Sequence, residues 1–256
     1  MRAAEGAPRP GPPGPFRRAP PARYYAGSVS QAPAPPTRDA ADRPGLFLTF
    51  EGGDGVGKTT QTRILAEALR AEGVEVLVTR EPGGTDLGAE IRRLLLDGGH
   101  VDPRAEALLY AADRAHHVAT LVRPALERGA VVVSDRYLDS SVAYQGAARS
   151  LGAEDVRSLS LWATGGLLPD RTILLDADPA LADRRTGGRG GRDRLERESD
   201  AFRAALREQF LALADAEPGR IVVIDAARPV EAVTAAVRSA LDPLLDARSG
   251  PGGRGA

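Results

Sequence analysis

Residues 52–59 constrain the fold of this chain more than any other part of its sequence. They fit the pattern G-x-x-x-x-G-K-[ST] and read Gly52, Gly53, Asp54, Gly55, Val56, Gly57, Lys58 and Thr59. The apolar run 46–50 predicts a buried strand before them, and the apolar spacing in 58–72 predicts a helix after them. Glycines let backbone N–H groups converge on phosphate oxygens, and a helix N-terminus adds partial positive charge. We therefore expect a nucleotide-phosphate site here rather than an ordinary Gly-rich turn.

The reactive side chains of this loop suit ATP with Mg²⁺. Lys58 is the single lysine in a chain whose other basic residues are arginines. A compact cation at this position matches the β- and γ-phosphates, and the hydroxyl of Thr59 matches Mg²⁺. Glu51 and Asp54 are near enough to share the metal, and Thr60 completes the predicted ATP-binding stretch.

Predicted strands and helices alternate along the chain. Alternation implies a parallel sheet with helices on both sides, so we predict an α/β fold of the P-loop NTPase type, with three α/β/α layers, five parallel strands and a mobile lid. Ligands in such folds bind at the carboxyl ends of the strands. The predicted strands are 46–50, 75–79, 131–134, 172–176 and 220–225. The predicted helices are 58–72, with Ile64, Leu65, Ala68 and Leu69 on one face, 87–96, 103–128 with a candidate break near Pro124, one after Asp139, 153–164, 179–185, 199–215 and 229–245.

The two ends of the chain differ in composition from the rest. Residues 1–44 hold 11 of the 20 prolines and cannot bury enough apolar surface to offset their ordering entropy, so we predict a disordered tail with local polyproline character. A docking or localisation tail and a misplaced translation start are the alternatives. Residues 45–246 are the predicted folded domain, and the Gly-rich residues 247–256 are a predicted flexible tail.

Composition excludes several classes of function. The chain has no cysteine and a formal net charge of −1, which excludes disulfides and thiolate metal sites and argues against nucleic-acid and membrane partners. No apolar run is long enough to span a bilayer and no secretory signal is present, so we expect a cytoplasmic protein. His100, His116 and His117 are interpreted as part of solvated helix faces rather than as metal ligands.

Two other predicted strand ends carry charged residues. Asp135 ends a buried strand and can orient Mg²⁺ or cap a turn, while Arg136 would reach a second anion, such as an acceptor phosphate. The tight turn of residues 80–85, Arg-Glu-Pro-Gly-Gly-Thr, aims Arg80 and Glu81 across the strand ends. Arg80 suits a phosphate, and Glu81 would fix an arginine or a metal-bound water. A loop salt bridge is the alternative.

Three strings, at 80–85, 135–137 and 144–146, together resemble bacterial thymidylate kinases over roughly residues 46–245. The resemblance implies a dTMP kinase that transfers the γ-phosphoryl group of ATP to dTMP, giving dTDP and ADP in dTTP synthesis. It also implies a homodimer formed by packed helices.

The resemblance further implies the acceptor residues. Tyr110, where many relatives have Phe, would stack on thymine, and Arg114 would hold the edge of the base from the same helix face. Arg92 would bind the acceptor phosphate, with Arg80, Glu81 and Arg136 nearby. Ser141 and Gln145 would hydrogen-bond the base, and Tyr144 would crowd the sugar 2′ position and select a deoxyribonucleotide. The neighbours Leu108, Leu109 and Ala112 are expected to serve the core.

Residues 184–197 are Arg-dense and Gly-rich, which predicts a mobile lid that brings positive charge and excludes water. The resemblance implies a catalytic arginine in the lid, as in bacterial relatives of this kind. The phosphate loop has Gly55 and contains no arginine that could take this role. We therefore expect Arg189 or Arg192, then Arg194, to join Lys58, Asp54 and Arg136 in catalysis. The alternatives are a solvated basic loop and a nucleic-acid patch.

Two rival functions remain open at this point. One is another nucleoside-monophosphate kinase of the same fold. The residues that distinguish it from a dTMP kinase are Tyr110, Arg114, Tyr144 and Gln145, which suit a pyrimidine deoxynucleotide. The other is a nucleotide-binding switch protein without kinase activity, which would not need arginines on the acceptor side.

Overall fold

The computed structural model describes residues 45–149, 151–186 and 199–249. The predicted N-terminal tail and the lid residues Arg189, Arg192 and Arg194 lie outside the described residues. At the other end the last helix continues to Ser249, three residues into the stretch predicted to be a flexible tail.

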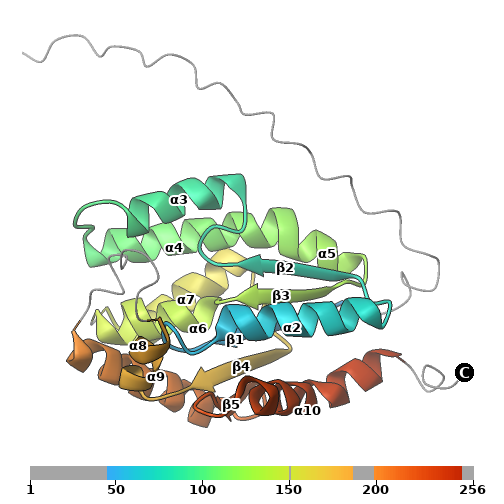
Figure 1. Ribbon diagram of the computed structural model, residues 1–256. Coiled ribbons are helices and arrows are strands. Elements are labelled where there is room, and N and C mark those ends of the chain that lie inside the picture. The colour runs from blue at the N-terminus through green and yellow to red at the C-terminus, as the bar shows by residue number, and fades with distance from the viewer. Residues whose placement is uncertain (1–44, 150, 187–198, 250–256) are drawn as a thin grey trace, which may run out of the picture. The chain divides into compact units, whose positions relative to one another are not determined.

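Five parallel strands form one sheet in the order β2-β3-β1-β4-β5 (Figure 1). Their bounds are β1 Leu46–Glu51, β2 Val76–Arg80, β3 Val131–Asp135, β4 Arg171–Asp176 and β5 Ile221–Asp225. Each predicted strand is confirmed, with ends that shift by no more than one residue. Because β1 lies in the middle, the loop that follows it opens at the centre of the carboxyl edge.

The predicted helices are also present, and two of them contain wider turns. The helical segments are α2 Lys58–Ala71, α3 Asp86–Leu96, α4 Pro103–His117, η1 Val118–Val122, α5 Arg123–Glu127, α6 Leu138–Ser141, η2 Val142–Ala148, α7 Ala153–Thr164, α8 Pro179–Thr186, α9 Asp200–Ala216 and α10 Val230–Ser249. The expected break near Pro124 takes the form of the π-helical η1. Proline lacks an N–H and its ring crowds the carbonyl four residues earlier, which the wider turn relieves.

Helices cover both faces of the sheet (Figure 1). Leu48 and Phe50 of β1 pack with α2 and α10. Phe47 faces the other way, toward η1 and α6, and its ring meets Tyr137 edge-on at 4.9 Å between centroids. Val131, Val132 and Val133 of β3 are fully buried, as a strand covered on both faces requires.

The buried face of α2 is rotated from the predicted one. Leu65 and Leu69 are buried as expected, but Ile64 is half-buried and Ala68 is exposed. Gln61 is buried in their place, because its amide donates to the carbonyl of Val230 and accepts from Thr234 on α10.

Two predictions for α4 are wrong. Leu108 is 58% exposed and Ala112 is exposed as well, because α4 turns Tyr110 and Arg114 inward instead. His117 is fully buried rather than solvated. Its Nε2 lies 2.7 Å from Oγ1 of Thr79, and its Nδ1 lies 2.8 Å from Oε1 of Glu81.

In the part of the chain that the structure describes, no helix is both long enough and apolar enough to cross a membrane.

A buried ion-pair network ties β4, β5 and α6 together. Arg220 donates to both carboxylate oxygens of Asp139, at 2.7 and 2.8 Å, and also to Glu217 and Thr172. The side chains of Arg220 and Asp139 are 10% and 3% exposed. Arg220 is therefore the cation that compensates the buried Asp139 carboxylate, and Glu217 shares that cation.

We predict that Arg220→Ala lowers the free energy of unfolding by about 3–5 kcal/mol, because it leaves the Asp139 carboxylate buried without its partner. Urea unfolding measures the change. Arg63→Ala is the matched control: it removes an exposed i,i+4 pair with Glu67 and should cost about 0.5 kcal/mol or less. Equal effects of the two substitutions would contradict the prediction.

Candidate active site

The loop after β1 folds as its sequence predicts, and glycine is required at its start. Gly52 has φ +124°, and a Cβ there would lie 2.3 Å from the carbonyl oxygen of Leu175. Only a residue without a side chain fits both the conformation and the space. The loop therefore passes directly against the neighbouring strand β4 and lines a cavity of about 610 Å³.

Lys58 lies at the base of this cavity. Its Nζ donates to the carbonyl oxygens of Gly52 and Gly53, at 3.0 and 2.6 Å. Burial, together with the charge of Arg136, lowers the pKa of Lys58 to about 8, although Asp135 and Asp54 act in the opposite direction. An anion entering the loop would favour the charged form.

Thr59 and Asp135 come together at the carboxyl edge. The hydroxyl of Thr59 donates to Oδ2 of Asp135 at 2.8 Å. A hydroxyl beside a carboxylate is a donor set that suits Mg²⁺, which takes few protein ligands and several phosphate or water oxygens. Both residues line the same cavity as Lys58.

Arg136 connects the phosphate loop with the helix that follows β3. Its backbone has φ +71°, and its guanidinium donates to the Gly52 carbonyl at 3.0 Å, to Ser140 Oγ at 2.9 Å and to Asp54. The guanidinium also lies over the ring of Tyr144, 5.3 Å from its centroid. Burial opposes the charge, but these partners hold the pKa of Arg136 well above its ordinary value.

Asp54 is the anionic partner in this cluster. It binds Arg136 through Oδ1 and accepts from the Tyr144 hydroxyl through Oδ2 at 3.2 Å. Burial acts to raise the pKa of Asp54, but Arg136 and Lys58 outweigh it and the pKa lies below its usual value. Asp54 is thus a stable anion next to the two cations.

Glu51 was expected to help bind the metal, but its carboxyl group lies elsewhere and makes other contacts. Its Oε1 accepts from the backbone N–H of Tyr137 and Ser140, and its Oε2 accepts from the Ser140 hydroxyl. Burial and the charge of Asp139 raise the pKa of Glu51 to about 7. Because both oxygens anchor the segment after β3, we leave Glu51 out of the metal site.

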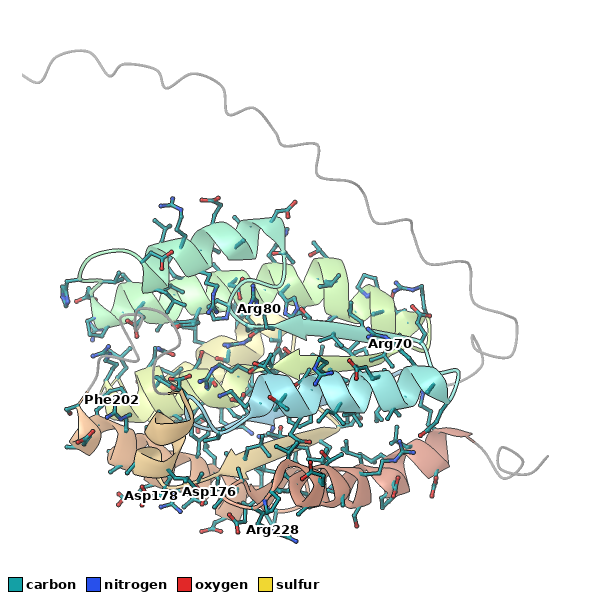
Figure 2. The ribbon with its side chains drawn as sticks, in the orientation of Figure 1. Arg70, Arg80, Asp176, Asp178, Phe202 and Arg228 are labelled. Carbon is teal, nitrogen blue, oxygen red and sulfur yellow. The ribbon has the colours of Figure 1, made fainter. Side chains whose placement is uncertain are left out.

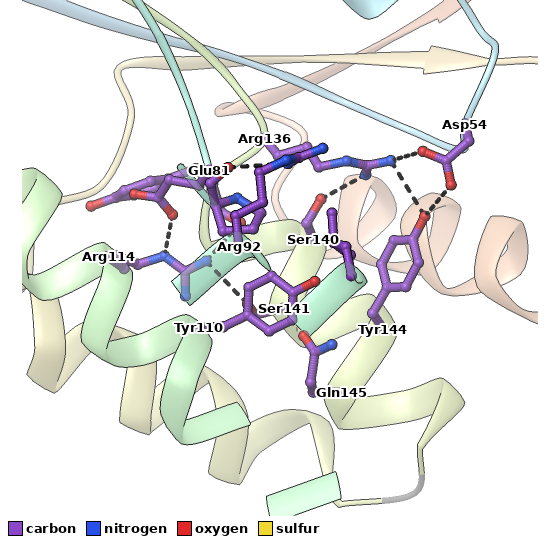
Figure 3. A pocket seen from close by; sticks show the side chains of 13 residues that line it. Asp54, Glu81, Arg92, Tyr110, Arg114, Arg136, Ser140, Ser141, Tyr144 and Gln145 are labelled. Carbon is purple, nitrogen blue, oxygen red and sulfur yellow. Dashed lines mark hydrogen bonds and ion pairs between the residues drawn. The ribbon is translucent and has the colours of Figure 1, made fainter. Parts of the chain in front are cut away.

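A second cavity lies beside the first, between α3, α4 and η2 (Figure 3). It is lined by Asp54, Glu81, Pro82, Arg92, Leu96, Tyr110, Arg114, Arg136, Tyr137, Ser140, Ser141, Tyr144 and Gln145. Its volume of about 110 Å³ is below the roughly 300–1,000 Å³ of ordinary ligand pockets, so a ligand of ordinary size would have to displace side chains to enter.

The structure brings together the predicted acceptor residues with one exception. Arg80 lines the cavity of the phosphate loop and a groove beside α2, but is not among the residues of the second cavity. Figure 2 shows it at the end of β2. Arg92, by contrast, lines both cavities and donates to the Pro82 carbonyl at 3.1 Å.

Glu81 orients Arg114. The carboxylate accepts from Nε of Arg114 at 2.7 Å, and both side chains are 2% exposed. The remaining guanidinium nitrogens donate to Ser160 Oγ, the Tyr137 carbonyl and Ser141 Oγ. Among the described residues these bonds use four of the five guanidinium hydrogens, and the fifth is on Nη1.

Sequence reasoning missed several residues of the site. Arg228 and Pro229 follow β5 and line the phosphate-loop cavity; their place after a strand end was the available signal. His117 and Asp113 lie against Glu81 and Gly83, next to the second cavity, and burial together with Glu81 raises the pKa of Asp113 to about 6. Glu106, buried behind Gln145, gave no local signal.

Comparisons with known proteins agree with this geometry. The family model described as thymidylate kinase matches residues 50–237. A thymidylate kinase of Leifsonia xyli is 64% identical over 203 residues, which are 78% of this chain and 96% of that protein. One from Clavibacter michiganensis is 60% identical over 205 residues, 79% of this chain and 97% of that protein. The crystal structure of thymidylate kinase from Ehrlichia chaffeensis superposes with a TM-score of 0.65 at 32% identity, covering 78% of this chain and 99% of that one.

The raised pKa of Glu51 predicts a pH-dependent stability. A carboxyl whose pKa is about 7 when folded and 4.5 when unfolded binds more protons in the folded state between these values. The stability it gives is present below about pH 4.5 and is lost as pH rises through 7. Glu51→Gln stays neutral, so its free energy of unfolding relative to wild type should increase by about 1–3 kcal/mol between pH 5 and 8. Chemical denaturation at each pH measures this, and a difference that does not vary with pH would refute it.

Proposed function

The chain belongs to the thymidylate kinase family, and from this premise we propose how its two cavities divide the reaction. As a thymidylate kinase it transfers the γ-phosphoryl group of ATP to dTMP, giving dTDP and ADP. We assign ATP to the cavity of the phosphate loop and dTMP to the cavity between α3, α4 and η2.

One observation carries this assignment: the two cavities share Asp54, Glu81, Arg92 and Arg136. Two polyanions that react must meet at a common boundary, and cations must cancel their repulsion there. Arg92 and Arg136 supply that charge at the boundary. Asp54 holds Arg136 in place.

On the donor side, backbone N–H groups of residues 52–60 and the ammonium of Lys58 bind the phosphates of ATP. Arg228 and Pro229 lie where the rest of the donor nucleotide would extend. Thr59 and Asp135 would hold Mg²⁺, which supplies charge neutralisation to the phosphate oxygens when bound.

On the acceptor side, Tyr110 stacks on the thymine ring while Ser141, Gln145 and the spare Arg114 hydrogen meet its edge. Tyr144 places its hydroxyl against Asp54 and Arg136, where the sugar passes toward its phosphate. A ribose 2′-hydroxyl would find this space filled, which favours a deoxyribonucleotide.

Little proton chemistry is required of the enzyme. The phosphate of dTMP is ionised near neutral pH, so an oxygen of that group attacks the γ-phosphorus in line and ADP leaves. Lys58 and Arg136 stabilise charge on the transferred group because they are already fixed by the protein. The lid arginines Arg189 and Arg192 are expected to complete this set. We place the enzyme in the cytoplasm, where a bacterial kinase meets ATP.

The assignment is tested by coupled ADP release with Mg·ATP and each of dTMP, dUMP, dCMP, AMP and GMP. Turnover should depend on the acceptor and be highest with dTMP. ADP release without dependence on any acceptor would overturn the assignment of the second cavity.

Lys58→Ala should reduce kcat/KM for dTMP phosphorylation by the equivalent of about 3–5 kcal/mol, because it removes one preorganised charge from the transition state. The same assay measures it, with Arg63→Ala on the exposed side of α2 as the control. Near-wild-type turnover of the Lys58 variant would refute the role given to the phosphate loop.

We also propose a homodimer through α4 and α7. The exposed side of α4 and of η1, which continues it, carries a stripe of apolar residues at helical spacing, Ala105, Leu108, Ala112 and Ala119. Trp162, on the neighbouring α7, is 82% exposed. A second copy of the chain would cover such a patch.

Leu108→Glu should convert the dimer to monomer, because it puts a charge into an apolar contact. Light scattering after size exclusion measures the mass. Val223→Glu, at a half-exposed apolar residue of β5, is the control and should leave the mass unchanged. A wild-type monomer, or a Leu108 variant that remains dimeric, would contradict the proposed interface.

A further inference from the structure

Glu106 is a buried carboxylate to which the mechanism above gives no role. It lies in the first turn of α4, is fully buried and does not itself line the acceptor cavity. Its Oε1 accepts a 2.8 Å hydrogen bond from Nε2 of Gln145. Nε of Arg149 lies 3.7 Å from the same oxygen. Burying a charged group costs free energy, so a carboxylate behind the cavity wall indicates a structural or functional role.

This contact fixes the direction of the Gln145 amide. An ionised carboxylate only accepts hydrogen bonds, whereas an amide has one donating and one accepting end. If the amide were turned over, two oxygens would face each other in a buried site. Nε2 of Gln145 must therefore face Glu106, and Oε1 must face away from it.

The amide oxygen is then available to a ligand. No described residue donates a hydrogen bond to Oε1 of Gln145. Gln145 lines the acceptor cavity together with Tyr110 and Ser141, and in Figure 3 its oxygen lies on the side of Tyr110. A base stacked on that ring meets a fixed acceptor at its edge.

The neighbouring groups are donors. Ser141 accepts from Nη2 of Arg114, so its hydroxyl hydrogen can turn toward the cavity, and Nη1 of Arg114 has a hydrogen that bonds no described residue. Thymine presents a carbonyl oxygen and an N3–H to such an edge, which matches donors next to an acceptor. Cytosine presents an N3 lone pair, which opposes the Gln145 oxygen, and a C4 amine, which opposes the donors of Ser141 and Arg114.

We propose that Glu106 is a positioning residue for acceptor specificity: it holds the Gln145 amide so that the site accepts a pyrimidine with N3–H and rejects one with an N3 lone pair. This inference rests on the assignment of the acceptor base to the second cavity. The selective group would thus be a carboxylate that does not touch the substrate.

Glu106→Gln tests the inference with two matched substrates. The new amide can donate to Gln145 as well as accept from it, so the Gln145 amide can turn over. The substrates are dTMP and 5-methyl-dCMP, which differ only at N3 and at the C4 substituent. We expect the ratio of their kcat/KM values to fall at least about tenfold, the usual scale for a mismatched buried hydrogen bond, through a higher KM for dTMP and a lower KM for 5-methyl-dCMP. The KM for ATP should not change.

The controls separate specificity from structural damage. Glu217→Gln removes another arginine-paired carboxylate and should leave the ratio unchanged. In a Gln145→Ala background, Glu106→Gln should no longer alter the ratio, because its effect passes through that amide. A folded Glu106→Gln enzyme with the wild-type ratio would overturn the inference and leave the proposed function intact. Wild-type enzyme without preference for dTMP would instead refute the proposed function.

Thermal unfolding of the Glu106 variant is recorded first. If that variant does not fold, the wild type supplies the deciding measurement. In its ¹⁵N spectrum, the side-chain NH₂ of Gln145 should exchange slowly with solvent before and after dTMP is added, because Glu106 holds it. Exchange as fast as that of an exposed glutamine would overturn the inference.

Discussion

The guanidinium of Arg136 is the interaction on which the arrangement of the site depends. It meets the Gly52 carbonyl and Asp54 of the phosphate loop on one side and Ser140 of α6 on the other. A positive φ is unfavourable for a side chain as large as arginine, yet it directs the guanidinium back across β1. The phosphate loop and α6 are therefore fixed relative to each other by one cation that also lines both cavities.

Two buried glutamates, Glu51 and Glu81, hold other parts of the site in place. Glu51 ends β1 and holds the backbone of the segment after Arg136, while Glu81 follows β2 and holds Arg114. Each accepts hydrogen bonds through both oxygens, with His117 completing the set at Glu81. Glu81 determines directly where Arg114 points, and Glu51 fixes the backbone that follows Arg136. Their role is positional, although each stands at a strand end where a catalytic acid could also stand.

The parts of this protein that were predictable are those whose cause is local in sequence. The phosphate loop, the single Lys58 and the alternation of strands and helices each follow from spacing within a short window, and the structure has them. The burial of His117 and the exposure of Leu108 depend on how α4 rotates against β2 and α3, which a helical repeat does not specify. Glu51 and Arg80 were correctly expected at the carboxyl edge of the sheet. Their position in the sequence, however, does not tell which way each side chain turns.

Under the proposed assignment of the acceptor cavity, the residues that contact the substrate differ from the residue that controls specificity. Arg114 is expected to bind the edge of the base. Most of its guanidinium hydrogens donate to Ser160, Ser141 and the Tyr137 carbonyl, so these bonds hold its side chain in one orientation. The amide of Gln145 has a donating end and an accepting end, and a rotation of the amide would exchange their positions. Its direction must be set from outside the cavity, and a carboxylate is suited to this because it has no donor to offer. A selective site therefore requires a fixed neighbour behind the amide as much as the amide itself.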